Sequence, residues 1–179
     1  NGARSVNSAY DFNTTNSVNG QGWGLANLPN SLPINPAKGG SDGIFTSSSM
    51  VLYDQHPDRA LATGLSFTRT VTVTARTQPL RITLVWTDPP GNPAVGIKLV
   101  NNLDLVVTNL DTGDAFAGNG IGGGSIFNDP VEAGSVTFDT VNNVENVYLQ
   151  GLFNRPLGTS YSVTVMARAV NINAVTAHA

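Results

Sequence analysis

Oxygen-bearing side chains gather in two short runs of this 179-residue sequence. The first is an Asn-Asn-x-Asp run that ends at Asp104, and the second contains Asp139, Asn142, Asn143 and Glu145. Proteins bind calcium through about six to eight oxygens from carboxylates, amides, backbone carbonyls and water. Neither run has the spacing of an EF-hand loop, and the same side chains could instead satisfy loop backbone at the end of a barrel. The two runs are therefore candidates for a calcium site, with loop stabilisation as the alternative.

The residue types that hydrolytic catalysis needs are scarce. A serine nucleophile requires a base, most often histidine, which a carboxylate orients. The two histidines are His178, near the last residue, and His56, in a polar loop beside Asp54 and Asp58. The surroundings of His56 are typical of a solvated turn. No two loop carboxylates have a spacing that pairs them for glycoside hydrolysis, so the sequence predicts no catalytic residue.

Composition excludes several classes of protein. Nine basic residues against 12 acidic ones give a formal net charge of −3, so the basic stripe of a nucleic-acid-binding domain is missing. The absence of cysteine excludes disulfides and thiolate metal sites. No apolar run approaches the roughly 18 residues of a membrane span, and the first residues do not form a signal peptide. The sparse charge and the Asn-, Thr- and Gly-rich surface favour an extracellular protein, in which case the chain is a mature fragment.

Alternation of apolar and polar residues predicts an all-β domain. In the run Leu80–Trp86, the side chains of Ile82, Leu84 and Trp86 share one parity, as in a strand with one face on a core. A proline-rich loop separates this run from a second strand at Leu99–Thr108. Further strands are predicted at Ile44–Tyr53, Gly64–Thr74, Val136–Phe138, Val144–Gln150 and Thr159–Ala169, and an edge strand is predicted to begin in the final NINAVTAHA. About eight short strands predict an antiparallel sandwich or barrel.

The N-terminal region stands apart from this regular pattern. The first 42 residues are rich in Asn and Gly and show no sustained alternation. We place the boundary within Pro33–Asp42, so that residues 1–42 form an N-terminal extension and residues 43–179 the β-domain. Within the β-domain, Gly113 lies in a turn between Asp111 and Asp114 and is available for the positive φ of a hairpin.

The aromatic residues suggest an alternative function, that of a carbohydrate-binding module. Sandwich folds often bind glycans at their loop ends. Such a module needs exposed, coplanar aromatic rings. Trp23 is the isolated candidate, whereas Trp86, Tyr148 and Tyr161 lie in predicted strands and are expected in the core. The aromatic residues therefore favour a packing role, with the carbohydrate-binding module kept as the alternative.

Several motifs occur together in the order PLRITLVWTDPPGNP, LVNNLDLVVTN, AGN, NNVENVYL and GTSYSVTVMA. Over roughly Leu61 to Ala169 they resemble the C-terminal β-barrel of bacterial subtilisin-like serine proteases of the alkaline, oxidatively stable type. Upstream, GQGWGLANLPNSL (Gly20 to Leu32) is similar to the end of a subtilase catalytic domain, with Leu25-Ala26 where Arg-Val is common. The extension would then be a remnant of that domain.

The resemblance implies a jelly-roll fold and a non-catalytic accessory role in a secreted protease. The catalytic Asp, His and Ser motifs of that family lie outside this sequence. The implied partner is the protease catalytic domain in cis, with protein substrate as a further partner. Members of the group carry calcium in this barrel. The matching stretch here holds Asp139, Asn142, Asn143 and Glu145, and Asp104 occupies the matching Leu-Asp-Leu.

Overall fold

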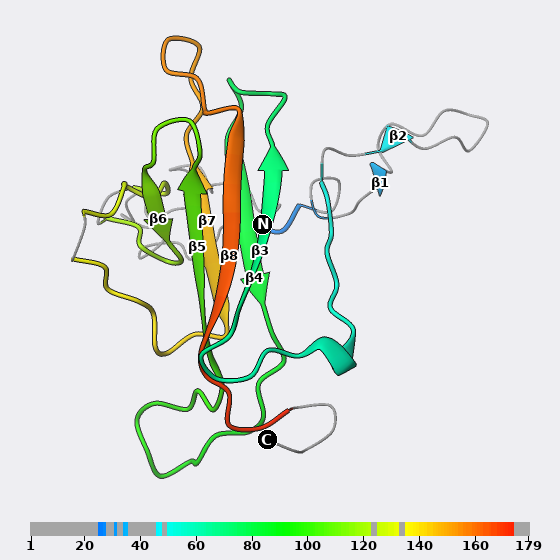
Figure 1. Cartoon of the computed structure of the whole chain (residues 1–179), viewed down its shortest axis with the longest axis vertical. Helices are drawn as coiled ribbons and strands as arrows, with labels where there is room; N and C mark the ends of the chain where they lie inside the picture. The colour runs from blue at the N-terminus through cyan, green and yellow to red at the C-terminus, as the bar shows by residue number, and fades with distance from the viewer. Residues whose placement is uncertain are drawn as a thin grey trace. The chain divides into compact units, whose positions relative to one another are not determined.

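The computed structural model describes residues 25–27, 31, 34–35, 46–47, 50–122, 125–132 and 135–173 (Figure 1). The chain divides into two compact units, residues 1–55 with 123–126 and residues 56–122 with 127–179. The first unit contains an antiparallel pair, β1 (Ile34–Asn35) and β2 (Thr46–Ser47). The predicted boundary within Pro33–Asp42 falls almost entirely outside the described residues and stays a prediction.

The second unit is built on a four-stranded antiparallel sheet with the order β3-β8-β5-β6. Its strands are β3 (Ser66–Thr72), β8 (Ser160–Ala169), β5 (Asn102–Asn109) and β6 (Ala115–Ala117). The β5–β6 hairpin contains Gly113 with φ of +85°, as the turn sequence predicts. The backbone amide of Gly113 donates to the carbonyl of Asn109 (2.8 Å) and closes the turn.

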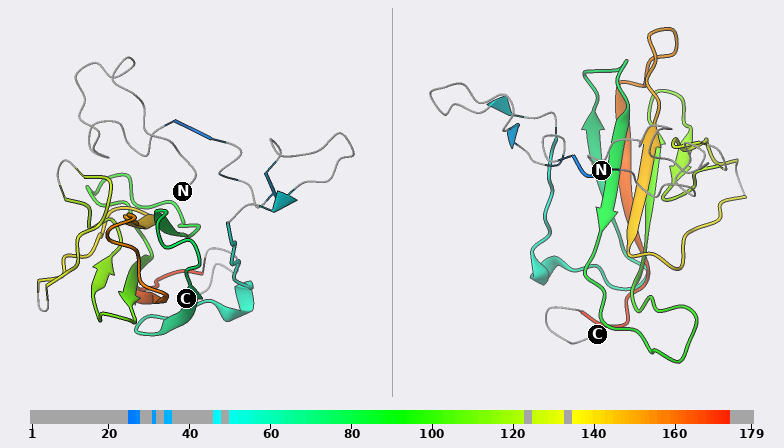
Figure 2. Two further views of the ribbon diagram at one scale, coloured as in Figure 1. Left: turned by 90° about the horizontal axis from the view of Figure 1, so that it is seen from above. Right: turned by 180° about the vertical axis from the view of Figure 1, so that it is seen from behind.

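A two-stranded sheet packs against this one. It pairs β4 (Leu80–Val85) with β7 (Val144–Leu149) in antiparallel register (Figure 2, right). The core between the sheets is aliphatic and aromatic and contains the buried residues Leu105, Val107, Phe116, Val147, Leu149, Leu157 and Tyr161. Ile82 and Leu84 pack against this cluster, which confirms the parity predicted for their strand. The all-β prediction is therefore confirmed, while the jelly-roll topology stays a prediction.

Two asparagines connect the β6 end of the large sheet to β7. The side chain of Asn128 donates to the carbonyl of Ala117 (2.8 Å) and accepts from the backbone amide of Tyr148 (2.8 Å). Asn119 has φ of +56°, a left-handed conformation that asparagine tolerates better than most residues. Its side chain accepts from the amide of Asn146 (3.0 Å) and donates to the carbonyl of Val144 (2.8 Å). These side chains hold the start of β7 beside the end of β6.

The proline-rich loop between β4 and β5 is fixed by side chains rather than by a strand pairing. Both carboxylate oxygens of Asp88 accept backbone amides, from Val100 and Asn101, at 2.8 Å each. The ammonium of Lys98 donates to three carbonyls of the same loop, including that of Pro93 at 2.8 Å. Asp88 is thus a loop-capping residue, in line with the structural reading of the loop carboxylates.

Three other strand predictions are wrong or only partly tested by the structure. The segment Val136–Phe138 forms no strand, so that prediction is wrong; an apolar run of three residues is too short to fix a sheet position. Of the run predicted at Ile44–Tyr53, Thr46–Ser47 form β2, whereas residues 50–53 form no strand, and Val51 and Leu52 are each 70% exposed. Residues 171–173 of the final segment are not in a strand, and residues 174–179 lie outside those described. No helix in the described ranges is long and apolar enough for a membrane crossing.

Candidate functional site

Glu145 occupies a core-facing position at the start of β7. It shares its parity with Val147 and Leu149 and is 1% exposed. Its Oε2 accepts a hydrogen bond from the backbone amide of Leu105 (2.5 Å). A Cβ atom at Gly118 would lie 2.2 Å from the same oxygen, so glycine is required there to make room for the carboxylate. The buried position of Glu145 is therefore built by the surrounding backbone.

Asp104 lies on β5 and is completely buried. One carboxylate oxygen pairs with the guanidinium Nε of Arg168, which is half exposed on β8. The guanidinium in turn lies over the ring of Phe138, 4.3 Å from its centroid. The ring of Phe138 thus helps to orient the positive partner of Asp104.

Asp139 follows in the same loop and is held by asparagine side chains. Asn119 and Asn142 donate to its Oδ2 at 2.6 and 2.7 Å, and the backbone amide of Val141 donates to Oδ1 at 2.8 Å. Partial burial raises the pKa of Asp139, but these hydrogen bonds outweigh it and the pKa is lowered overall. Asp139 therefore carries its negative charge beside the other two carboxylates.

We refer to Asp104, Asp139 and Glu145 as the carboxylate cluster. Burial raises the pKa of Glu145 to about 8, the Leu105 amide opposes this, and the charges of Asp104 and Asp139 add to it. Burial also raises the pKa of Asp104; Arg168 lowers it and Asp139 raises it further. The charge of Asp139 acts on both Asp104 and Glu145, and that of Asp104 acts on Glu145, so these sequence-distant carboxylates lie within electrostatic range of one another. With one guanidinium for three carboxylates, the cluster favours uptake of a proton or of a cation.

Buried oxygens without a hydrogen-bond partner are the candidate ligands for a cation. Within the described part of the chain, Asp104 Oδ1, Glu145 Oε1 and Asn102 Oδ1 are buried and accept no hydrogen bond. Such orphaned acceptors cost free energy when buried, and a cation would remove the cost. Hard oxygen donors of this kind suit calcium. No group of three or more His, Cys, Asp or Glu side chains converges on one point in the described ranges, so neighbouring amide oxygens and water would have to complete the shell.

The five predicted ligands do not all meet. Asp104, Asp139 and Glu145 form the cluster, and Asn142 reaches it through Asp139. Asn143 points elsewhere and donates to the carbonyl of Trp86 (3.0 Å).

Sequence reasoning overlooked Asn119 and Arg168, and it left Asn102 out of the ligand set although that residue lies in the first oxygen-rich run. One signal was available, since Glu145 stands on the apolar parity of its predicted strand, and a charge there is unusual.

The other candidate residues have structural roles. His56 caps a short 3-10 helix (Pro57–Arg59) by accepting from the Asp58 amide at 3.3 Å, and both side chains are highly exposed. This confirms the solvated turn predicted from the sequence. Tyr148 and Tyr161 are buried, as predicted, and Trp86 is half-buried with its indole nitrogen donating to the Asn101 carbonyl (3.0 Å). Trp23 lies outside the described residues.

Comparison with known proteins places half of the chain in a serine-protease-related context. No family profile matches the chain. Three curated relatives from Dictyostelium discoideum are named serine protease/ABC transporter B family proteins. TagD is 38% identical over 82 residues, tagB 40% over 91 and tagA 38% over 93, which is 46%, 50% and 51% of this chain. The chain spans only 4–5% of the length of these relatives. The similarity is thus to a small part of much longer serine-protease-related proteins.

Proposed function

We propose that this chain is a non-catalytic accessory domain of a secreted, subtilisin-like serine protease. Its role is to stabilise the catalytic domain in cis and to help present protein substrate. The observation that carries the proposal is the order of motifs from Leu61 to Ala169, together with the similarity to proteins named serine proteases. The scarcity of catalytic residue types agrees with it, since His56 is an exposed helix cap. Neither a nucleic acid nor a membrane is a partner in this proposal.

Two measurements test this role. The chain alone should not hydrolyse casein or a chromogenic peptide, and a serine-reactive fluorophosphonate should not label it. In the full-length protease, deletion of residues 43–179 should shorten the half-life of activity on heating while leaving kcat for a small peptide unchanged. Casein hydrolysis by the isolated chain would refute the proposal, and so would an unchanged half-life of the deletion variant.

We further propose that the carboxylate cluster binds calcium. The ligands would be Asp104 Oδ1, Glu145 Oε1 and Asn102 Oδ1, because these buried oxygens accept no hydrogen bond from the part of the chain that the structure describes. Asp139 and Asn142 would contribute charge and a neighbouring amide. A ligand that binds only the folded state raises its stability by mass action, by about 2.7 kcal/mol at a hundredfold excess over Kd. Thermal melts in calcium and in chelator test this, and identical curves would remove the metal from the proposal.

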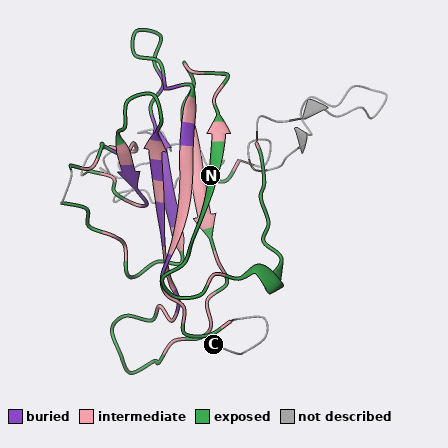
Figure 3. Cartoon of the chain, viewed as in Figure 1, coloured by how far each residue is buried: buried purple, intermediate pink, exposed green. Residues whose placement is uncertain are grey.

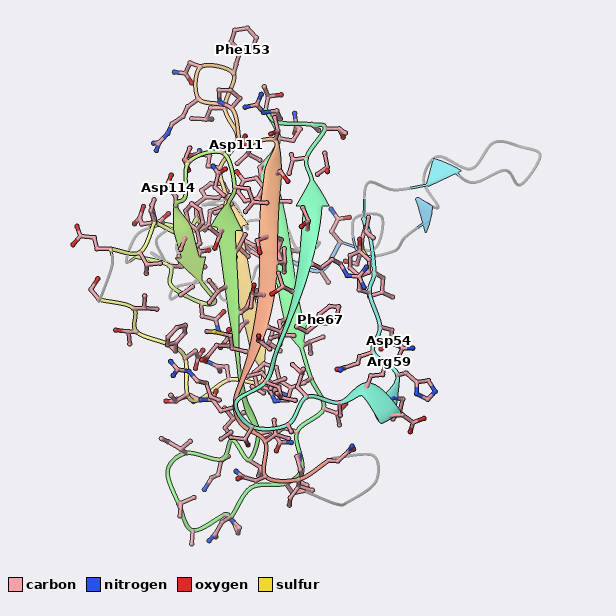
Figure 4. All side chains as sticks on the ribbon, viewed as in Figure 1. Asp54, Arg59, Phe67, Asp111, Asp114 and Phe153 are labelled. Carbon is pink, nitrogen blue, oxygen red and sulfur yellow. The ribbon has the colours of Figure 1, made fainter. Side chains whose placement is uncertain are left out.

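The carbohydrate-binding alternative gains no support from the aromatic residues. Tyr148 and Tyr161 are buried in the sheets, and Trp86 is committed to a hydrogen bond with the backbone. Phe153, at the tip of a tight turn, is 95% exposed, but it stands alone there (Figure 4). A single ring without a coplanar neighbour does not form a sugar platform. Binding on a glycan array would reverse this conclusion.

A further inference from the structure

An Asn-Gly pair, Asn119-Gly120, follows directly after β6 in the loop next to Gly118. Asparagine deamidates when the backbone nitrogen of the next residue attacks its side-chain carbonyl carbon. Glycine in that next position hinders the attack least, because it has no Cβ. Asn119 is half-buried and Gly120 is exposed, so the pair lies where water is available. Two other Asn-Gly pairs, at residues 1–2 and 19–20, lie outside the described residues.

In the folded chain, both groups that would react are held in hydrogen bonds. The amide of Gly120, whose nitrogen would attack, donates to the carbonyl of Ala117 (3.1 Å). The carboxamide of Asn119, which would be attacked, accepts from the amide of Asn146 (3.0 Å) and donates to Asp139 Oδ2 (2.6 Å). The carboxamide therefore cannot turn to the Gly120 nitrogen until these bonds break.

The same bonds connect the end of β6 to the start of β7, and we call them the β6–β7 link. The carboxamide of Asn119 donates to the carbonyl of Val144 (2.8 Å), the first residue of β7, and the backbone amide of Asn119 donates to the carbonyl of Asn146 (2.9 Å). Figure 3 shows both strands mainly in purple, so the link joins two buried strands. Deamidation in the fold thus requires a local opening, which costs less free energy than global unfolding.

We propose that Asn119 is a deamidation site that reacts when the β6–β7 link opens, and that its product prevents the link from closing again. The nitrogen of Gly120 forms a bond to Cγ of Asn119, and the carboxamide nitrogen leaves as ammonia with the proton of the Gly120 amide. The cyclic imide that results is opened by water, which breaks one of its two C–N bonds and returns a proton to the nitrogen. The products are aspartate or isoaspartate, so water is consumed, ammonia is released and a neutral amide becomes a carboxylate.

The new carboxylate cannot replace the amide in the link. It has no N–H group, so Asp139 Oδ2 and the carbonyl of Val144 each lose a donor. Its charge would lie at hydrogen-bond distance from the carboxylate of Asp139, where like charges repel. Aspartate tolerates the φ of +56° at this position as asparagine does, so the aspartate product acts through charge and hydrogen bonding. This inference depends neither on calcium nor on the protease context.

Incubation of the full chain in mildly alkaline buffer with chelator tests the role of opening. Peptide mapping by mass spectrometry measures the conversion of Asn119, with and without denaturing urea. Asn119 should react in the folded chain, but at least about tenfold more slowly than in urea, because only the locally opened fraction reacts. Gly120→Ala should slow the reaction in urea, since its Cβ hinders ring closure. Equal rates with and without urea, or no reaction of the folded chain, would refute the proposal.

Substitutions test the effect of the product. Asn119→Asp reproduces the aspartate product and should lower the melting temperature in chelator by about 5 to 10 °C. Asn154→Asp adds the same charge at an exposed position and should leave the melting temperature nearly unchanged. The double variant Asn119→Asp with Asp139→Asn exchanges donor and acceptor across the 2.6 Å contact and should recover part of the loss. An unchanged melting temperature of Asn119→Asp, or no recovery in the double variant, would overturn the proposal.

Discussion

The pH dependence of stability should report directly on Glu145. Its pKa is raised from 4.5 to about 8 in the folded chain, so the folded state holds a proton that the unfolded state releases. This contribution to stability is complete below pH 4.5, decreases as the pH rises through the interval, and is lost above about pH 8. At about 1.4 kcal/mol per pH unit, the interval from 4.5 to about 8 corresponds to at most about 5 kcal/mol.

Glu145→Gln removes the titrating proton while keeping the shape of the side chain. Its amide oxygen can still accept from the Leu105 amide, which donates to Glu145 Oε2 at 2.5 Å. Denaturant titrations between pH 5 and 9 in chelator should therefore give a free energy of unfolding that falls with pH in the parent chain. It should fall less steeply in the variant, where only Asp104 keeps a raised pKa within the cluster. Glu132→Gln makes the same chemical change at an exposed site and should follow the parent.

Calcium should reverse the trend if it binds the cluster, because the metal and the proton compete for the same oxygens. In saturating calcium, the stability of the parent chain should rise with pH over this interval, and Glu145→Gln should weaken that response. If the parent and the variant lose stability in parallel in chelator, Glu145 does not hold a proton in the fold and our reading of the cluster is wrong.

Three further substitutions test the packing around the site. Leu105→Ala should lower the free energy of unfolding by about 2–5 kcal/mol, because it empties a buried position. Its control, Leu110→Ala, changes a residue that is 53% exposed and should alter the free energy of unfolding by less than about 0.5 kcal/mol. Equal losses in the two variants would contradict the assigned core. Gly118→Ala should lower the free energy of unfolding by about 1–3 kcal/mol in denaturant titrations, because the added Cβ would lie 2.2 Å from a carboxylate oxygen of Glu145. An unchanged free energy of unfolding would mean that this carboxylate moves freely. Tyr161→Phe removes the oxygen that accepts the Gly158 amide at 2.9 Å and should cost about 1–3 kcal/mol, which thermal melts would detect.

The sequence predicted much of the sheet, because the alternation of apolar and polar residues along a strand indicates which face is buried. The runs that became β3, β4, β7 and β8 were predicted within a few residues of their bounds. The turn at Gly113 was predicted from residue types that tolerate positive φ. By contrast, Val136–Phe138 forms a loop, and its contact with the Arg168 guanidinium through Phe138 is a tertiary one that its own pattern does not predict.

The sequence predicted only part of the candidate site. The sequence supplied the oxygen-rich runs and their strands, and so it placed Asp104 and Glu145 in the ligand set. It could not show that both are buried, that Asn143 turns away to Trp86, or that Arg168 neutralises one carboxylate. These facts depend on contacts between residues some 40 to 64 positions apart. Local alternation determines which side of a strand faces inward, whereas the charge state of a carboxylate depends on every group the tertiary fold brings around it.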